Sequence, residues 1–365
     1  MNWFEVVNAA EIPSPALLLF RERIEVNLAE MLRIAGGPAR LRPHIKTHKL
    51  PELVRRQVEL GITKFKCATI AEAEMAAENG AKDVLLAYQP VGPQIGRLLE
   101  LAARQPGVRF GCLFDHSDSL TQLRRAANNR PLTLFLDLDV GQGRTGVPPD
   151  ANAFALYRAM VEAGCFLPGG LHAYDGHLHD SDPAVRSADC DSAFAPVATL
   201  RNQLEKAGLP VPTVVAGGSP TFPMHARRDG VELSPGTTVL WDAGYAKKLP
   251  DLNFLPAAVL LTRVVSKPVP NRLCLDLGHK AVASEMPHPR AVFLNLPDAT
   301  PVMHSEEHLV VETPQAPGIP AGAEFYALPW HVCPTVALHE EVWVVDQQRA
   351  SARWTVTARK RRLGI

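Results

Sequence analysis

The chain has 365 residues, of which 46% are hydrophobic and 21% charged, a balance typical of a globular protein with one large and one smaller domain. Lys plus Arg and Asp plus Glu number 38 each, so no net charge favours nucleic acid or an anionic membrane. No run of about 18 apolar residues predicts a membrane-spanning helix, and the N-terminus lacks a signal-peptide pattern. The six cysteines include no CxxC pair, which is typical of reduced thiols, so we expect a cytoplasmic protein.

From about residue 40 to 240, short apolar runs alternate with amphipathic segments. Eight strands are predicted, in chain order 41–45, 64–69, 83–89, 108–115, 132–139, 167–174, 211–216 and 230–234. Helical patterns lie between them, at 70–80, 92–104, 117–129, 149–163 and 185–207. Strands that alternate with helices pair in parallel through right-handed crossovers, so eight such units predict a (β/α)8 barrel. An open doubly wound sheet with fewer strands is the alternative.

The pattern changes after about residue 245. Short β-rich runs are separated there by Pro and Gly clusters, at 257–265, 272–278, 291–296, 308–312 and 341–346. These runs predict a smaller all-β domain, and we expect the opening strand, 16–20, to pair with it. The predicted division is a barrel over 22–240 and a β-rich domain made of 1–21 plus 241–365.

Chemically unusual residues follow the carboxyl ends of the predicted barrel strands, where the active sites of such barrels lie. Glycine-rich turns after strands seven and eight are typical phosphate-binding turns, because only glycine lets a ligand approach the backbone N–H groups closely. The candidate residues are Lys46 after the first strand, Arg144 in the turn DVGQGRTG after the fifth, Tyr174, His177 and His179 after the sixth, Gly217, Gly218 and Ser219 after the seventh, and Gly236 and Thr237 after the eighth.

A lysine at one strand end and phosphate-binding turns at others predict pyridoxal 5'-phosphate, held by Lys46 as a Schiff base. Arg144 suits the phenolic oxygen of that cofactor, and Tyr174 suits its pyridine ring. The alternatives are a basic surface turn at 42–49, a surface salt bridge for Arg144 and a core position for Tyr174. Matching residues at four further strand ends favour the cofactor site.

His331 and Cys333 stand two residues apart in the segment HVCPT. Side chains at positions i and i+2 of a strand point to the same face, so on a strand the imidazole and the thiolate would lie side by side. Such a pair suits zinc or a similar divalent ion, and two protein ligands leave open positions for water and substrate. A buried cysteine beside a hydrogen-bonded histidine is the alternative. His304, Glu306 and His308 resemble a further ligand cluster, which a solvated loop explains equally well.

Taken together, the motifs RPHIKTHK, DVGQGRTGV, AYDG, GGS, SPGTTVLWDAGY, LDLGHKA, SEEHLVV and HVCPT resemble the D-threonine aldolase and D-serine dehydratase family. The resemblance covers nearly the whole chain and implies the fold of the alanine racemase N-terminal domain, a pyridoxal phosphate barrel, followed by a β-domain. It implies the following roles: Lys46 as the Schiff-base lysine, Arg144 at the cofactor oxygen, Tyr174 beside the ring, Ser219, Gly236 and Thr237 near the phosphate, and His331 with Cys333 at the metal. Aldolases of the family often carry His-x-Asp at the metal and dehydratases His-x-Cys, as here, whereas VGQGR and PTVALH look closer to the aldolase branch.

The resemblance implies a lyase that depends on pyridoxal 5'-phosphate and a divalent metal (Zn, Mn, Mg or Co) and acts on a small-molecule D-3-hydroxy-α-amino acid. D-threonine aldolase-type cleavage to glycine and an aldehyde is favoured, with His177 or His179 as the base for the substrate hydroxyl. Asp175 and Asp180 lie in the same turn, so the base stays open between these four residues. A D-serine or D-3-hydroxyaspartate dehydratase is the alternative, ahead of a racemase or a non-catalytic cofactor-binding protein. The family expectation is a homodimer.

Overall fold

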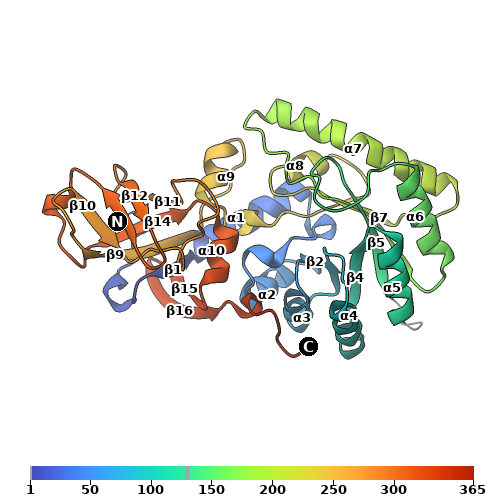
Figure 1. Ribbon diagram of the computed structural model, residues 1–365, viewed down its shortest axis with the longest axis horizontal. Helices are drawn as coiled ribbons and strands as arrows, with labels where there is room; N and C mark the ends of the chain where they lie inside the picture. Colours follow the sequence, from blue (N-terminus) through green and yellow to red (C-terminus); the bar gives the residue numbers. More distant parts are fainter. Residues whose placement is uncertain (1, 128–131) are drawn as a thin grey trace. The chain divides into compact units, whose positions relative to one another are not determined.

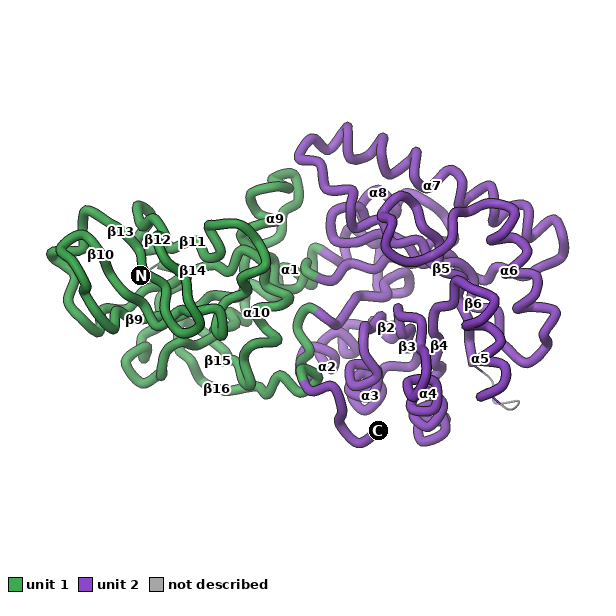
Figure 2. Tube along the Cα trace, in the orientation of Figure 1, with its two compact units in different colours: residues 1–30, 47–50, 237–359 green, residues 31–46, 51–236, 360–365 purple. Residues whose placement is uncertain are grey.

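The computed structural model describes residues 2–127 and 132–365 (Figure 1). The last two residues of the helix predicted at 117–129 therefore lie outside the described residues. The chain divides into two compact units (Figure 2). The β unit comprises Met1–Glu30, Thr47–Leu50 and Thr237–Arg359, and the barrel unit comprises Met31–Lys46, Pro51–Gly236 and Lys360–Ile365.

Seven parallel strands form the sheet of the barrel unit, in the order β2-β3-β4-β5-β6-β7-β8. Every strand pairs with the next one along the chain, as expected for successive strand–helix units. Their bounds are β2 (Lys64–Cys67), β3 (Asp83–Leu86), β4 (Arg109–Phe114), β5 (Thr133–Leu138), β6 (Leu167–Ala173), β7 (Thr213–Ala216) and β8 (Val231–Leu233).

An irregular segment takes the place of the first barrel strand. Leu41 forms an isolated parallel bridge to Leu233 of β8, and His44 forms one to Lys66 of β2. Pro43 lies between them and has no N–H to donate, so the segment cannot form a continuous ladder. The regular strand predicted at 41–45 is therefore wrong, but the closed barrel of eight segments is confirmed, and the open sheet is excluded.

Helices follow the barrel strands with local signals that the sequence contains. The hydroxyl of Thr69 accepts from the N–H of Glu72 and caps α3, and Gly80, with φ 97°, follows the end of that helix. The carboxylate of Asp150 caps α6 in the same way. The helices are α1 (Arg21–Ala35), which crosses from one unit to the other, α2 (Pro51–Glu59), α3 (Ile70–Glu78), α4 (Pro93–Arg104), α5 (Ser117–Ala127), α6 (Ala151–Glu162), α7 (Pro183–Lys206) and the short α8 (Phe222–His225).

The β unit is built on a nine-stranded sheet. The opening strand β1 (Ala16–Phe20) pairs with β9 (Ala258–Ser266) and with β15 (Glu341–Asp346), as expected from the sequence. Its apolar face joins a core cluster of buried residues that includes Leu18, Val259 and Val345. The other elements are α9 (Ala243–Lys248), β10 (Arg272–Leu275), β11 (Ala291–Phe293), β12 (Thr300–His304), β13 (Leu309–Glu312), β14 (Glu324–Pro329), α10 (Val332–Leu338) and β16 (Arg349–Thr355). Within the described residues, no helix is long and apolar enough to cross a membrane.

Candidate active site

Lys46 lies at the carboxyl end of the irregular first segment, in the single 3-10 turn Ile45–Thr47. The segment before it is buried, and Arg42 is fully buried. The Arg42 guanidinium donates to Asp83 and to Glu232, each at 2.7 Å. The alternative of a basic surface turn is therefore wrong, because the charge of Arg42 is neutralised inside the barrel unit, whereas the side chain of Lys46 keeps partial exposure.

Three cationic side chains surround the ring of Tyr174, which follows β6. The Lys46 Nζ lies 5.9 Å from the ring centroid, the Lys66 Nζ 5.0 Å and the Arg144 Cζ 5.4 Å. Positive charge that converges on one aromatic ring favours a planar anionic ligand. The structure thus brings together three of the residues singled out from the sequence, Lys46, Arg144 and Tyr174.

Lys66, the third cation, is a residue that the sequence analysis missed. It lies on β2 and is only 3% exposed. Burial above all, and then the charge of Lys46, lower the pKa of Lys66 against the opposing carboxylates of Asp137 and Asp175, to a net value of about 7. The available signal was a lysine between Phe65 and Cys67, inside a strand predicted to be buried.

A buried pair, His172 on β6 and Asp137 on β5, was also missed. The His172 Nδ1 lies 2.6 Å from the Asp137 carboxylate, which also accepts from the Gln89 amide at 2.8 Å. Burial raises the pKa of Asp137, but the hydrogen bonds from His172, Thr145 and Gln89 and the charge of His172 together outweigh it, and the net pKa lies below the ordinary value. Because Nδ1 donates to Asp137, Nε2 carries a lone pair, and this buried atom has no hydrogen-bond partner among the described residues. An orphaned buried acceptor is expected where a ligand supplies the missing donor.

The turns after β7 and β8 contain the predicted phosphate-binding glycines. Gly217 has φ 80°, a conformation that favours glycine, and a Cβ on Gly218 would lie 3.2 Å from the ring of Tyr174. The N–H of Gly236 donates to the hydroxyl of Ser219 at 3.1 Å, which joins the two turns. Two joined glycine-rich turns beside the Tyr174 ring suit a ligand that has both an aromatic ring and a phosphate group.

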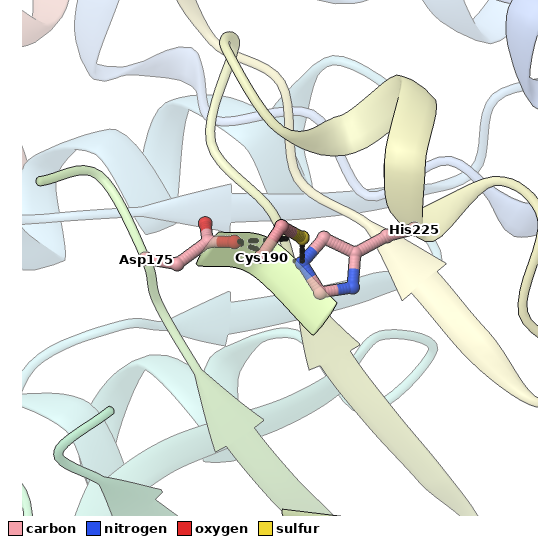
Figure 3. A group of neighbouring side chains, drawn as sticks. All are labelled: Asp175, Cys190 and His225. Carbon is pink, nitrogen blue, oxygen red and sulfur yellow. Dashed lines mark hydrogen bonds and ion pairs between the residues drawn. The ribbon is translucent and has the colours of Figure 1, made fainter. Parts of the chain in front are cut away.

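Figure 3 shows a second buried cluster in the barrel unit, made of Asp175 after β6, Cys190 on α7 and His225 on α8. One ligand atom from each lies within 4.8 Å of the others, a spacing that could hold a metal ion. The His225 Nε2 lies 2.8 Å from an Asp175 oxygen and 3.3 Å from the Cys190 Sγ.

Arg228 decides the chemistry of this cluster. Its guanidinium lies 3.0 Å from the Nδ1 of His225 and can only donate, so Nδ1 accepts and Nε2 carries the proton. A metal on Nε2 would have to displace that proton, and the Arg228 charge, 3.6 Å from the Cys190 Sγ, opposes a dication. Burial raises the pKa of the Cys190 thiol to about 11, so the thiol stays protonated. The cluster is therefore a hydrogen-bond network.

The four candidate bases after β6 differ in their surroundings. Both oxygens of Asp175 accept hydrogen bonds within the buried network, so this residue is removed from the candidates. Asp180 is exposed and accepts from the N–H of Asp182. His179 is exposed, whereas His177 is partly buried, with an Nδ1 that has no partner in the described part of the chain.

His331 and Cys333 do not lie on a strand, so the predicted strand placement is wrong. Strand β14 ends at Pro329, His331 is the N-cap of α10, and Cys333 lies in the first turn of that helix. Proline is well tolerated in the first helical turn, and Pro334 follows Cys333 directly, which accounts for a helix here. The two side chains are nevertheless in hydrogen-bond contact.

The surroundings of this pair suit a metal ligand. The His331 Nδ1 is hydrogen-bonded to Glu285, a residue that the sequence analysis missed and that would orient the imidazole. Burial lowers the pKa of His331, but Cys333 and Glu285 raise it, to about 9. The Cys333 Sγ lies 3.2 Å from the hydroxyl of Thr47, the residue after Lys46, and 3.5 Å from that of Thr237. An imidazole and a thiol with a carboxylate behind the imidazole fit a borderline-soft divalent ion.

The cluster proposed around His304 does not suit a metal. The Nδ1 of His304 accepts from Arg290 at 3.1 Å and its Nε2 donates to the carbonyl of Leu277 at 3.0 Å, so both ring nitrogens are occupied. Glu306 forms an ion pair with Lys280 on the surface. His304 and Glu306 are thus accounted for by hydrogen bonds and an ion pair within the β unit.

Comparison with known proteins identifies the family. Residues 21–241 match the alanine racemase N-terminal domain, and residues 257–345 match a putative serine dehydratase domain. Over 363 residues the chain is 32% identical to a D-threonine aldolase from Arthrobacter sp, covering 96% of this chain and 93% of that protein. The chain belongs to the D-threonine aldolase family. The family resemblance of the sequence motifs is thereby confirmed.

Further relatives of this aldolase-family chain are similar to it in sequence or in fold. A 3-hydroxy-D-aspartate aldolase from Paracoccus denitrificans is 28% identical, covering 97% of this chain and 94% of that protein. The crystal structure of D-threonine aldolase from Filomicrobium marinum superposes with a TM-score of 0.89 at 28% identity, covering 98% of each chain. D-threo-3-hydroxyaspartate dehydratase from Delftia sp. HT23 shares the fold, with a TM-score of 0.83 at 21% identity over 95% of this chain and 98% of that one. The predicted alanine racemase-like barrel with a β-domain is confirmed.

Proposed function

We propose that this protein is a lyase that uses pyridoxal 5'-phosphate and a divalent metal to cleave a D-3-hydroxy-α-amino acid to glycine and an aldehyde. One observation carries the proposal. In a chain that is 32% identical to a D-threonine aldolase over 96% of its length, Lys46 and Arg144 converge on the ring of Tyr174. This is the combination of amine, fixed cation and flat ring that the cofactor requires.

The residues that would hold the cofactor follow from this arrangement. Lys46 would bind its aldehyde carbon, Arg144 its phenolic oxygen, and Tyr174 the face of its ring. The phosphate would lie at the two linked turns, which contain Gly217, Gly218, Ser219, Gly236 and Thr237. When bound, the cofactor supplies an electron sink for the pair left on Cα.

Two further groups of residues would act on the substrate hydroxyl. His331 and Cys333 would hold a Zn, Mn, Mg or Co ion, which polarises the hydroxyl, and the imidazole–thiolate pair favours zinc. Either His177 or His179 would accept the hydroxyl proton as the Cα–Cβ bond breaks. Partial burial and an unpartnered Nδ1 favour His177 for this role.

A dehydratase acting on D-serine or D-3-hydroxyaspartate is the second candidate, and Cys333 favours it, because a His-x-Cys pair is typical of that branch. Product analysis with D-threonine, D-serine and D-threo-3-hydroxyaspartate, with and without a chelator, separates the two. Glycine plus an aldehyde supports the proposal. A 2-oxo acid plus ammonia contradicts it and supports the dehydratase. Activity that survives complete chelation contradicts the metal requirement of both.

The oligomeric state, the cellular location, the domain boundaries and the absence of macromolecular partners remain predictions. We expect a homodimer in the cytoplasm, with domains at 22–240 and at 1–21 plus 241–365, and no nucleic-acid or membrane partner. Light scattering after size exclusion tests the oligomeric state, and limited proteolysis tests the domain boundaries.

A further inference from the structure

The carboxylate of Asp175 accepts two hydrogen bonds from the turn after β7. One of its oxygens accepts from the N–H of Gly218 at 3.1 Å and from the hydroxyl of Thr221 at 2.7 Å. The Thr221 hydroxyl in turn accepts from the same Gly218 N–H at 3.2 Å. Asp175 is only 3% exposed, so these bonds are protected from competing water. The turn 217–221, which contains the proposed phosphate residues, is therefore held by a side chain from another strand end.

The second oxygen of Asp175 is bound by a chain of two hydrogen-bond donors, His225 and Arg228. Arg228 donates to the Nδ1 of His225 at 3.0 Å, and the Nε2 of His225 donates to the second oxygen of Asp175 at 2.8 Å. Asp191 binds the far side of the Arg228 guanidinium. Because a guanidinium cannot accept, every hydrogen bond in this chain has a fixed direction. Burial raises the pKa of Asp175, but the hydrogen bonds from His225, Thr221 and Gly218 hold it below the ordinary value, so the carboxylate is ionised.

The glycines of the turn need this support. Gly217 has φ 80°, and two adjacent glycines have a wide choice of backbone conformations, so ordering the turn costs more entropy than usual. Without Asp175 the N–H of Gly218 would lose its carboxylate acceptor. The lack of a side chain at Gly218 therefore lets a ligand come close to the backbone, but the N–H of Gly218 is bonded to Asp175 and cannot bind the phosphate.

We propose that Asp175 is a positioning residue for the cofactor phosphate, with His225 and Arg228 fixing its orientation and offsetting its charge. The inference rests on the proposed function, because it needs a phosphorylated cofactor at the turn 217–221. A buried carboxylate near a phosphate would repel it, and the Arg228 guanidinium, linked through the neutral imidazole of His225, counters that repulsion.

The test compares two ligands, pyridoxal 5'-phosphate and pyridoxal, which lacks the phosphate. In Asp175→Asn the amide NH2 faces a donor in either orientation, the Nε2–H of His225 in one and the N–H of Gly218 in the other. His225 cannot change tautomer to relieve this, because Arg228 donates to its Nδ1. We expect the Kd for pyridoxal 5'-phosphate, measured by equilibrium dialysis, to rise at least tenfold, and that for pyridoxal to change less than twofold. The 31P resonance of the bound cofactor should shift as well.

Three further variants control for folding and for the composition of the cluster. His225→Gln keeps an N–H that can donate to Asp175 and should retain most of the affinity, whereas His225→Ala should behave like Asp175→Asn. The Sγ of Cys190 lies 3.8 Å from Asp175 and 3.3 Å from the Nε2 of His225, so this thiol contacts these two residues but not the turn 217–221. Cys190→Ala should therefore leave both Kd values within twofold of the wild type.

Several outcomes would overturn the proposal. If Asp175→Asn weakens both ligands equally, or neither, Asp175 does not act through the phosphate. If Cys190→Ala weakens the cofactor as much as Asp175→Asn does, and also removes a Co²⁺–thiolate absorption band seen in the wild type, the cluster is a metal site. A wild type that binds the cofactor but forms a 2-oxo acid contradicts the aldolase function and leaves this inference standing. A wild type that binds no cofactor refutes both.

Discussion

Replacing Lys66 with methionine tests whether the barrel unit keeps a buried cation at a cost in stability. Burial lowers the pKa of Lys66 to about 7, whereas a lysine in the unfolded chain has a pKa of about 10.4. Between these values the unfolded chain binds more protons than the native protein, so stability rises with pH. For this single group, the gain between pH 7 and pH 9 is about 2 kcal/mol, from about 1.4 kcal/mol per pKa unit.

The assay is urea unfolding of the cofactor-free protein, followed by far-UV circular dichroism at pH 7 and pH 9. Lys66→Met should be more stable than the wild type at pH 7 and should gain about 2 kcal/mol less than the wild type on going to pH 9. Other titrating groups cancel, because they are common to both proteins. The exposed Lys82→Met is the matched control and should keep the wild-type dependence. Equal pH dependence in wild type and Lys66→Met would refute the reasoning.

Three further predictions concern the neighbouring residues. Lys46→Ala should abolish the visible absorption of bound pyridoxal 5'-phosphate, while Lys49→Ala, in the same basic run, should keep it; a band in Lys46→Ala would refute the central assignment. Arg42→Met should lower the urea midpoint and cost about 3 kcal/mol, because Asp83 and Glu232 lose the buried cation that they share and keep only the partly exposed Arg109 and Lys64; a loss under about 1 kcal/mol would contradict this. Cys333→Asp should keep metal-dependent cleavage, measured as glycine release, whereas Cys333→Ala should lose at least tenfold of it; equal activities would remove Cys333 from the metal site.

The order of the barrel segments was accessible from the sequence, because strands and helices have different hydrophobic periods. Once a parallel barrel is predicted, all strand ends meet at one edge, so Lys46, Arg144 and Tyr174 were expected to converge before any distance was known. The irregular first segment was harder, since Pro43 interrupts a strand without removing it from the barrel. The helix at His331 was missed because a two-residue period in HVC outweighed the proline that follows it.

The sequence by itself determined the fold, the family and which residues stand at the strand ends, because these depend on local periodicity and on motifs read in order. Only the tertiary structure decided which atoms of those residues are already occupied. Asp175 looked like a candidate base, and its partners Gly218 and His225 lie 43 and 50 residues further along the chain. Whether a carboxylate is a base, a metal ligand or an anchor depends on such distant donors, and donors brought together by folding leave no pattern in the local sequence.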